Sequence, residues 1–116
     1  MVYRGSCHCG RITFEVDGDI QAAKECNCSI CHRLGALRWF TSRDKLRLST
    51  PESNLSSYTF GPGKIKHHFC SVCGCAPFAE AAHKGVAMVS VNLRCIADLD
   101  LSRVKISQFD GRSLPV

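Results

Sequence analysis

The chain has 116 residues, of which 45% are hydrophobic and nine are cysteine, and its formal net charge is +5. This length is typical of one domain, and we predict a single domain over residues 1–116. No window approaches the roughly eighteen apolar residues that cross a membrane, and the N-terminus lacks the apolar run of a secretory signal. We therefore expect a cytoplasmic protein that does not span a membrane.

Short runs of alternating or β-branched residues predict a mostly β chain. The first run covers residues 11–16, with glycine turns at Gly10 and Gly18 on either side. Later runs are rich in β-branched and aromatic residues, which favour strands. They predict strands at residues 36–41, 46–49, 57–60, 65–69, 86–92 and 104–109.

Turns and helix occupy little of the chain. The glycines and proline of residues 61–63 predict a tight turn that joins the strands around it into a hairpin leading to Cys70. Ser29 is a candidate N-cap for one helical turn that ends near Gly35, and residues 96–101 are expected to form another.

The cysteines indicate either a disulfide framework or metal ligands. Their number is odd, they cluster at one- and two-residue spacings, and the expected compartment is reducing, all of which disfavours disulfides. We therefore interpret them as thiolate ligands, for which zinc is the fitting metal.

Two cysteine pairs lie far apart in the sequence, Cys7 with Cys9 and Cys70 with Cys73, and a glycine follows each pair. Glycine permits the positive φ that a zinc knuckle needs after its second cysteine. We predict one closed, structural zinc site from these four residues, which would close a loop over most of the fold. The alternative is a set of unconnected buried thiols.

A second group, Cys26, Cys28 and Cys31, places three thiols within six residues. Three protein ligands leave the fourth tetrahedral position for water or substrate, as in catalytic zinc sites. The alternative is a closed site with a fourth protein ligand. The candidates for that ligand are His32, Cys75, Cys95 and a histidine of His67-His68, and by default the two extra cysteines are buried free thiols.

Thiolate ligands change the interpretation of the charge. One four-thiolate and one three-thiolate zinc lower the net charge from +5 to about +2. The remaining lysines and arginines are scattered, so no nucleic-acid partner is expected. Three thiolates also make zinc a weak Lewis acid, which favours reversible binding of an oxygen or sulfur of a reactive small molecule over hydrolysis.

Other side chains near the cysteines have both a functional and a plain interpretation. Arg33 is a candidate for holding a substrate carboxylate, or is simply solvated. His8 and His32 are candidate proton shuttles, or surface residues. Trp39 and Phe40 either pack in the core or form a wall of a small pocket.

Five segments together resemble the glutathione-dependent formaldehyde-activating enzyme family, whose domain is shared with centromere protein V. The cysteines carry most of the likeness, and the remaining segments extend it over nearly the whole chain. The matching segments are Gly5 to Gly10, Cys26 to Cys31 with Arg33 and Gly35-Ala36, Phe69 to Gly74, Val91-Asn92-Leu93 and Phe109-Asp110-Gly111.

The resemblance implies a β-tent fold, in which folded antiparallel sheets surround a structural zinc. It assigns Cys7, Cys9, Cys70 and Cys73 to that zinc, and Cys26, Cys28 and Cys31 to a catalytic zinc. The named reaction joins formaldehyde to glutathione as S-hydroxymethylglutathione, which is a carbon–sulfur lyase reaction in reverse.

The leading hypothesis is therefore a zinc-dependent carbon–sulfur lyase that acts on adducts of a small aldehyde with a thiol. Zinc would polarise the aldehyde oxygen, glutathione is one candidate thiol, and the biological role would be aldehyde detoxification. The alternative is a non-catalytic zinc module that binds macromolecules, since centromere protein V acts in chromosome organisation. A third hypothesis is zinc storage or sensing.

Overall fold

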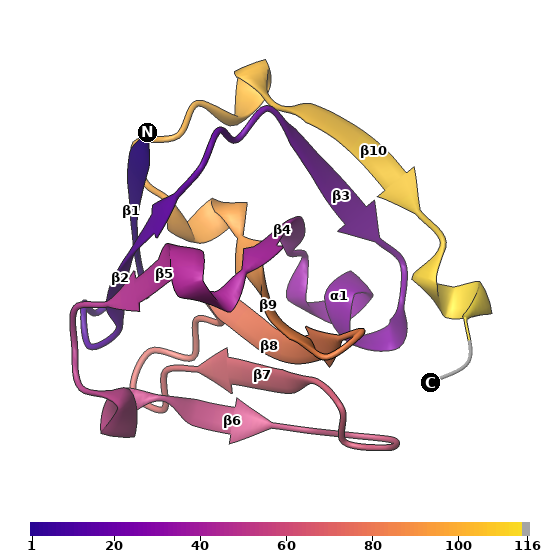
Figure 1. Cartoon of the computed structure of the whole chain (residues 1–116), viewed down its shortest axis with the longest axis horizontal. Helices are drawn as coiled ribbons and strands as arrows, with labels where there is room; N and C mark the ends of the chain where they lie inside the picture. The colour runs from indigo at the N-terminus through magenta and orange to yellow at the C-terminus, as the bar shows by residue number, and fades with distance from the viewer. Residues whose placement is uncertain (115–116) are drawn as a thin grey trace.

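Two β-sheets of unequal size make up the computed structural model, which describes residues 1–114 (Figure 1). The smaller sheet has the order β1-β2-β5 and is antiparallel throughout. Its strands are β1 (Val2–Ser6), β2 (Thr13–Asp17) and β5 (Leu46–Leu48). The mostly β prediction is confirmed.

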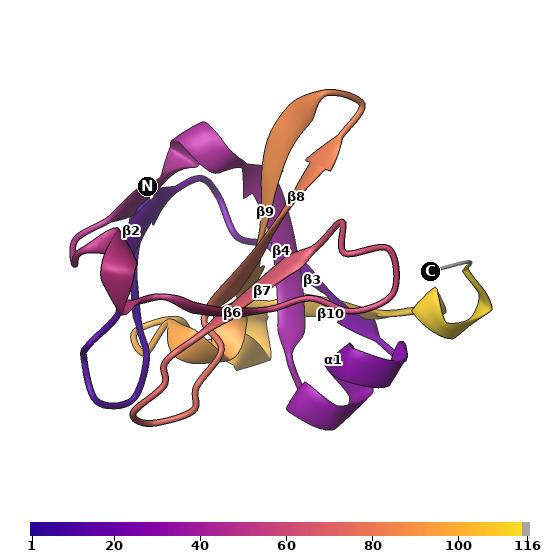
Figure 2. The ribbon, with the colours of Figure 1, turned by 90° about the horizontal axis from the view of Figure 1, so that it is seen from below.

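The larger sheet has seven strands in the order β10-β3-β4-β9-β8-β7-β6. All neighbours are antiparallel except β10 and β3, which run parallel. The strands are β3 (Ala22–Cys26), β4 (Leu37–Ser42), β6 (Ser56–Tyr58), β7 (Lys66–Phe69), β8 (Phe78–His83), β9 (Val86–Asn92) and β10 (Lys105–Phe109). Figure 2 shows the β8–β9 hairpin projecting away from the rest of the chain.

The core lies where the two sheets face each other. Phe14 of β2 meets Phe78 of β8 edge to face, with ring centroids 5.7 Å apart, and both side chains are fully buried. Gly5 of β1 permits this packing, because a Cβ there would come within 2.1 Å of the Phe14 ring. Aromatic pairs of this kind add about 0.5–1.5 kcal/mol to the gain from burial alone.

Most of the predicted strands are confirmed. The runs after residue 35 correspond to β4, β5, β6, β7, β9 and β10, and the hairpin is formed by β6 and β7. The strand predicted at residues 11–16 corresponds to β2, which begins later than predicted, at Thr13. Ile12 belongs instead to a turn in which its carbonyl accepts from the Cys7 amide at 3.0 Å and its own amide donates to Cys7 Sγ at 3.2 Å.

Three strands, β1, β3 and β8, were not predicted from the sequence. The turn expected over residues 96–101 is shorter than predicted: it covers Ile96 to Leu99, where the Leu99 amide donates to the Ile96 carbonyl at 3.3 Å. Short 3-10 turns lie on either side of that segment, at Leu93–Cys95 and Leu101–Arg103. Each begins where a side chain accepts from a backbone amide, Asn92 from Arg94 and Asp100 from Ser102.

The helical turn near Gly35 is confirmed as α1 (Ser29–Leu34), which lies beside β3. Its N-cap is Cys28 rather than Ser29, and no side chain caps it. Gly35 ends the helix in the left-handed conformation, with its amide bonded to the Cys31 carbonyl. No helix within residues 1–114 is long and apolar enough to cross a membrane.

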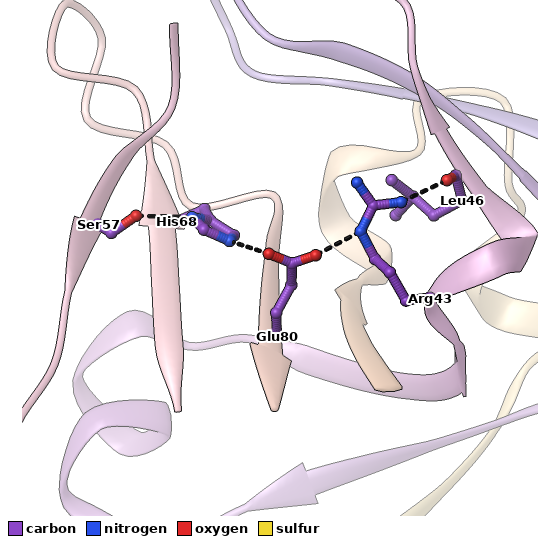
Figure 3. Close-up of polar contacts among 5 residues, drawn as sticks. All are labelled: Arg43, Leu46, Ser57, His68 and Glu80. Carbon is purple, nitrogen blue, oxygen red and sulfur yellow. Dashed lines mark hydrogen bonds and ion pairs between the residues drawn. The ribbon is translucent and has the colours of Figure 1, made fainter. Parts of the chain in front are cut away.

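A chain of polar contacts links the far edge of the larger sheet to the smaller one (Figure 3). Ser57 Oγ lies 2.7 Å from Nδ1 of His68, whose Nε2 lies 2.6 Å from a Glu80 carboxylate oxygen. The other Glu80 oxygen pairs with Arg43, which also donates to the Leu46 carbonyl at 2.6 Å. Both ring nitrogens of His68 are therefore engaged in this network.

Candidate metal centres and the cavity

The thiols of Cys7, Cys9, Cys70 and Cys73 form the first cluster, in which all four sulfurs lie within 4.8 Å of one another. The Cys9 sulfur is 3.8 Å from that of Cys7 and 3.6 Å from that of Cys70. Sulfurs at the corners of a zinc tetrahedron with bonds of about 2.3 Å would be about 3.8 Å apart. The cysteines are free of disulfides, so the donor set and its spacing both fit zinc.

Two similar turns present these thiols. The Cys7 amide bonds to the carbonyl five residues later, and the Cys70 amide does the same with the Cys75 carbonyl at 2.9 Å. Gly10 and Gly74 have φ of +84° and +81°, as the knuckle prediction requires. The first turn connects β1 to β2 and the second connects β7 to β8, so the cluster joins the two sheets.

Backbone amides stabilise negative charge on the second of these turns. Cys70 Sγ accepts from the amides of Val72 and Cys73 at 3.4 Å each, and the Cys73 amide is the main cause that lowers the pKa of the Cys70 thiol. The amides of Cys75 and Cys9 lower the pKa of Cys73 to about 5. The thiolate, the form that binds metal, is thus favoured at neutral pH for Cys73. The Arg11 amide also lowers the pKa of Cys9, but burial and the neighbouring thiols of the cluster outweigh it and raise that pKa to about 11.

The thiols of Cys26, Cys28 and Cys31 form the second cluster, whose three sulfurs also lie within 4.8 Å of one another. Cys26 ends β3, and Cys31 lies on α1. The Cys28 amide points at Cys26 Sγ, 3.4 Å away. The local chain therefore folds the three thiols toward a common point, and three soft donors fit zinc.

Within residues 1–114, no further cysteine, histidine or acidic ligand atom joins this second group. Among the predicted alternatives for a fourth ligand, Cys75 packs against the first cluster, and both nitrogens of His68 are used in the polar network. His67 lines the same cavity as the three thiols, but its ring nitrogens are not within 4.8 Å of all three sulfurs. Cys95 and His32 also fall outside the group. Among residues 1–114, the second cluster therefore offers three protein ligands.

A buried arginine compensates charge at the second cluster. Burial raises the pKa of Cys31 to about 11, and the neighbouring Arg38 guanidinium opposes that rise. Arg38 lies on β4, is only 4% exposed and donates weakly to the Ser90 carbonyl at 3.5 Å. Burial also raises the pKa of Cys28, but the Cys31 amide and other hydrogen bonds outweigh it, so that pKa is lowered.

A cavity of about 620 Å³ opens directly over the second cluster. Lys24, Arg33 and Arg112 line it, and none of these cations forms an ion pair with a carboxylate of the described residues. Lys24 Nζ instead lies 4.9 Å from the ring centre of Phe109. The fold thus gathers three charges that appear scattered in the sequence.

His67 also lines this cavity, and it is the least satisfied polar side chain there. It is 7% exposed, and neither ring nitrogen has a hydrogen-bond partner among residues 1–114. Its ring stacks on that of Phe60, with centroids 5.7 Å apart. Burial, and then the positive charge of Arg38, lowers the pKa of His67, so the imidazole is neutral.

The C-terminal segment lines the cavity beside the second cluster. The Asn27 amide donates to the Phe109 carbonyl at 3.2 Å, and its side-chain amide donates to Asp110 at 2.9 Å. The Asn27 side-chain oxygen accepts from the Arg112 amide at 2.9 Å. Asn27, between two of the cluster cysteines, therefore fastens residues 109–112 to the cluster.

The other candidate residues named from the sequence differ in whether they line the cavity. Arg33 lines the cavity, and so does Phe40, whereas Trp39 packs against the core on the opposite side of β4. His8 and His32 are exposed and do not line the cavity. Arg33 and Phe40 thus lie where their functional interpretation requires them, and the two histidines do not.

Arg38 and His67 are the site residues whose position the sequence did not indicate. Arg38 was one of several scattered charges, and His67 entered only as an optional metal ligand. The one signal for Arg38 is its position inside the apolar run of residues 36–40, since a charge in such a run is buried only when something compensates it.

Two thiol clusters of this geometry, held by the turns of a two-sheet β fold, define a small protein that could hold two metal ions through thiolates. Residues 2–110 match the glutathione-dependent formaldehyde-activating enzyme family, and the chain belongs to that family. A solved Rhodobacter sphaeroides protein is similar in fold and sequence. The two chains share 29% identity and superimpose with a TM-score of 0.77, over 90% of this chain and 99% of that one.

Proposed function

We propose that this protein is a zinc-dependent carbon–sulfur lyase that acts on adducts of a small aldehyde with a thiol. The observation that carries the proposal is the three-thiol cluster beneath a cavity, with no fourth protein ligand among residues 1–114. A closed four-ligand site would leave no position for a substrate. Cys26, Cys28 and Cys31 are the proposed catalytic-site ligands, and the first cluster holds the structural zinc.

The reaction forms or breaks one bond between a thiol sulfur and a carbonyl carbon. In the direction of synthesis the sulfur adds to the carbon, the carbonyl electron pair moves to oxygen, and the thiol proton ends on that oxygen. Bound zinc would supply Lewis-acid polarisation of the oxygen. Arg38 adds fixed positive charge beside the cluster, where negative charge develops on the oxygen.

The cations of the cavity suit a thiol that carries carboxylates, of which glutathione is the family's example. Lys24, Arg33 and Arg112 come from separate elements and are not paired with protein carboxylates in the described part of the chain. They are therefore available to bind such a ligand. We expect the protein to act in the cytoplasm, where thiols stay reduced.

The test compares Cys28→Ser with wild type. Formation of S-hydroxymethylglutathione from formaldehyde and glutathione is measured by NMR exchange spectroscopy, which separates catalysis from the uncatalysed reaction. We expect turnover to disappear in Cys28→Ser while circular dichroism shows a folded protein. Cys95→Ala, which removes a thiol outside both clusters, serves as the control and keeps its activity. A folded, fully active Cys28→Ser protein would contradict the proposal.

The second candidate is a non-catalytic zinc module that binds macromolecules, and the unpaired cations of the cavity favour it. Such a module should associate with polyanions, with an affinity that falls steeply as salt rises. Titration of a nucleic-acid duplex at low salt distinguishes the candidates, because the lyase proposal expects no nucleic-acid binding.

A further inference from the structure

The cavity over the second cluster has walls that are mainly apolar. Phe40, Phe60, Ile65, Met88, Phe109 and Leu114 all line it. Four of these large side chains are also among the most exposed apolar residues of the described chain: Phe40 at 52%, Ile65 at 45%, Phe109 at 38% and Leu114 at 54%. Single exposed apolar residues are ordinary, but several around one cavity are typical of a binding site.

The imidazole of His67 is the polar group in this apolar cavity that most needs a hydrogen-bond partner. Its imidazole is buried, and neither nitrogen is paired within the part of the chain that the structure describes. Burial without a partner costs free energy in the free protein. The neighbouring ring of Phe60 covers one face. A ligand oxygen in the cavity would give the imidazole the partner that residues 1–114 do not provide.

We infer that the cavity binds adducts whose aldehyde-derived part is an aromatic or branched aliphatic group, and that His67 hydrogen-bonds the oxygen of that part. The inference rests on the proposed lyase function and names its substrate class. The apolar walls enclose the hydrocarbon part of the ligand. The cations Lys24, Arg33 and Arg112 hold a carboxylate on the same ligand.

A neutral imidazole can hydrogen-bond both the thiol adduct and the free aldehyde. It carries one donor and one acceptor, so it can accept from the hydroxyl of the adduct or donate to the carbonyl oxygen of the free aldehyde. The carbon–sulfur bond breaks with its electron pair going to sulfur, and the hydroxyl proton ends on that sulfur. A single-carbon aldehyde would leave the apolar walls in contact with water and gain nothing from them.

Three stable ligands separate the parts of this inference without any turnover. Phenyllactate has a phenyl ring, a hydroxyl and a carboxylate; lactate lacks the ring, and 3-phenylpropionate lacks the hydroxyl. Their affinities for the zinc-loaded full chain are measured by NMR titration. We expect phenyllactate to bind at least about tenfold more tightly than lactate, because the ring is buried. It should also bind about threefold more tightly than 3-phenylpropionate, because of the added hydrogen bond.

Variants of His67 test its assigned role. In His67→Phe the preference for the hydroxyl should disappear while the preference for the ring remains, and His67→Gln, which keeps a donor and an acceptor, should restore part of it. His83→Phe is the matched control, because His83 is exposed at the end of β8 and outside the cavity. It should bind all three ligands as wild type does.

Equal affinities for lactate and phenyllactate would overturn the apolar substrate class, and a hydroxyl preference that survives in folded His67→Phe would overturn the role of His67. These outcomes are independent of the lyase test. A protein that shows the expected binding but no turnover would refute the proposed function, whereas an active protein that binds lactate as well as phenyllactate would refute only this inference.

Discussion

Gly111 lies directly against Cys26 of the second cluster. A Cβ at Gly111 would come within 2.5 Å of Cys26 Sγ and within 3.3 Å of Cys28 Cβ. A free cysteine side chain could rotate away from such a contact, but a sulfur bound to metal is fixed. The C-terminal segment can therefore pack this closely against the second cluster only because residue 111 is a glycine.

Gly111→Ala should accordingly weaken the second zinc without unfolding the protein. The added methyl group displaces the Cys26 sulfur, so we expect the affinity of that zinc to fall at least about tenfold, while the first zinc stays bound. Competition with a chromophoric chelator measures both affinities. Ser107→Ala, on the neighbouring β10, should behave as wild type. Unchanged zinc affinity in Gly111→Ala would contradict the close packing.

The two clusters should contribute very differently to stability. Residues 7 to 73 are joined through the first cluster, and a cross-link over a loop of this length is worth about 4 kcal/mol of chain entropy. The second cluster spans only residues 26–31 and closes a short loop. Cys70→Ser should therefore lower the free energy of unfolding by about 4 kcal/mol or more, measured in urea, and Cys28→Ser by much less. Equal losses would contradict this division.

Glu80 should stabilise the fold in a pH-dependent way. Burial raises the pKa of its carboxyl, but the hydrogen bonds from His68 and Arg43 outweigh it and lower the pKa below the ordinary value of 4.5. A carboxylate with a lowered folded-state pKa contributes stability above its unfolded pKa and loses it as the pH falls through the folded one. Its contribution is therefore complete at pH 7.

Glu80→Gln should lower the free energy of unfolding by about 1–2 kcal/mol at pH 7, because the charge-assisted hydrogen bonds are lost. The difference from wild type should stay constant down to about pH 5 and shrink below pH 4.5. Urea unfolding at several pH values measures it. Glu52→Gln, an exposed carboxylate outside the network, is the control. A difference that does not change between pH 7 and pH 3 would contradict the assignment.

Arg38 should set the acidity at which the second zinc is released. Its guanidinium lowers the pKa of Cys31, which burial otherwise raises. In Arg38→Met the Cys31 thiol holds its proton to a higher pH, so the second zinc should be released at a higher pH than in wild type. Zinc release during acid titration measures the shift, with Arg33→Met as the exposed control. A midpoint that does not move would show that Arg38 does not act on the cluster.

The two thiol clusters could be predicted because the cysteines of each group or pair are close together in the sequence. Cys26, Cys28 and Cys31 lie within six residues, and a glycine follows each cysteine pair of the first cluster. The strands with many β-branched residues were found for the same reason. The sequence did not reveal β3 and β8, whose alanines, lysine and glutamates have low strand propensity. Pairing with distant partners, such as β3 with β10, overrides that propensity.

The cavity could not be predicted, because residues far apart in the chain build it. Lys24, Arg33 and Arg112 come from a strand, a helix and the C-terminal segment. The parallel β10–β3 pairing and the position of α1 beside β3 bring them together. The burial of Arg38 and His67 likewise depends on which face of β4 and β7 is covered. One charged residue in a short strand does not specify that face.

The number of zinc ions per chain tests most directly whether the second cluster is an open metal site. It is counted by elemental analysis in freshly purified protein, before and after mild chelation. We predict two zincs in wild type, of which the chelator removes one, and a single resistant zinc in Cys28→Ser. One zinc in wild type that resists the chelator and is unaffected by Cys28→Ser would contradict an open metal site in the second cluster.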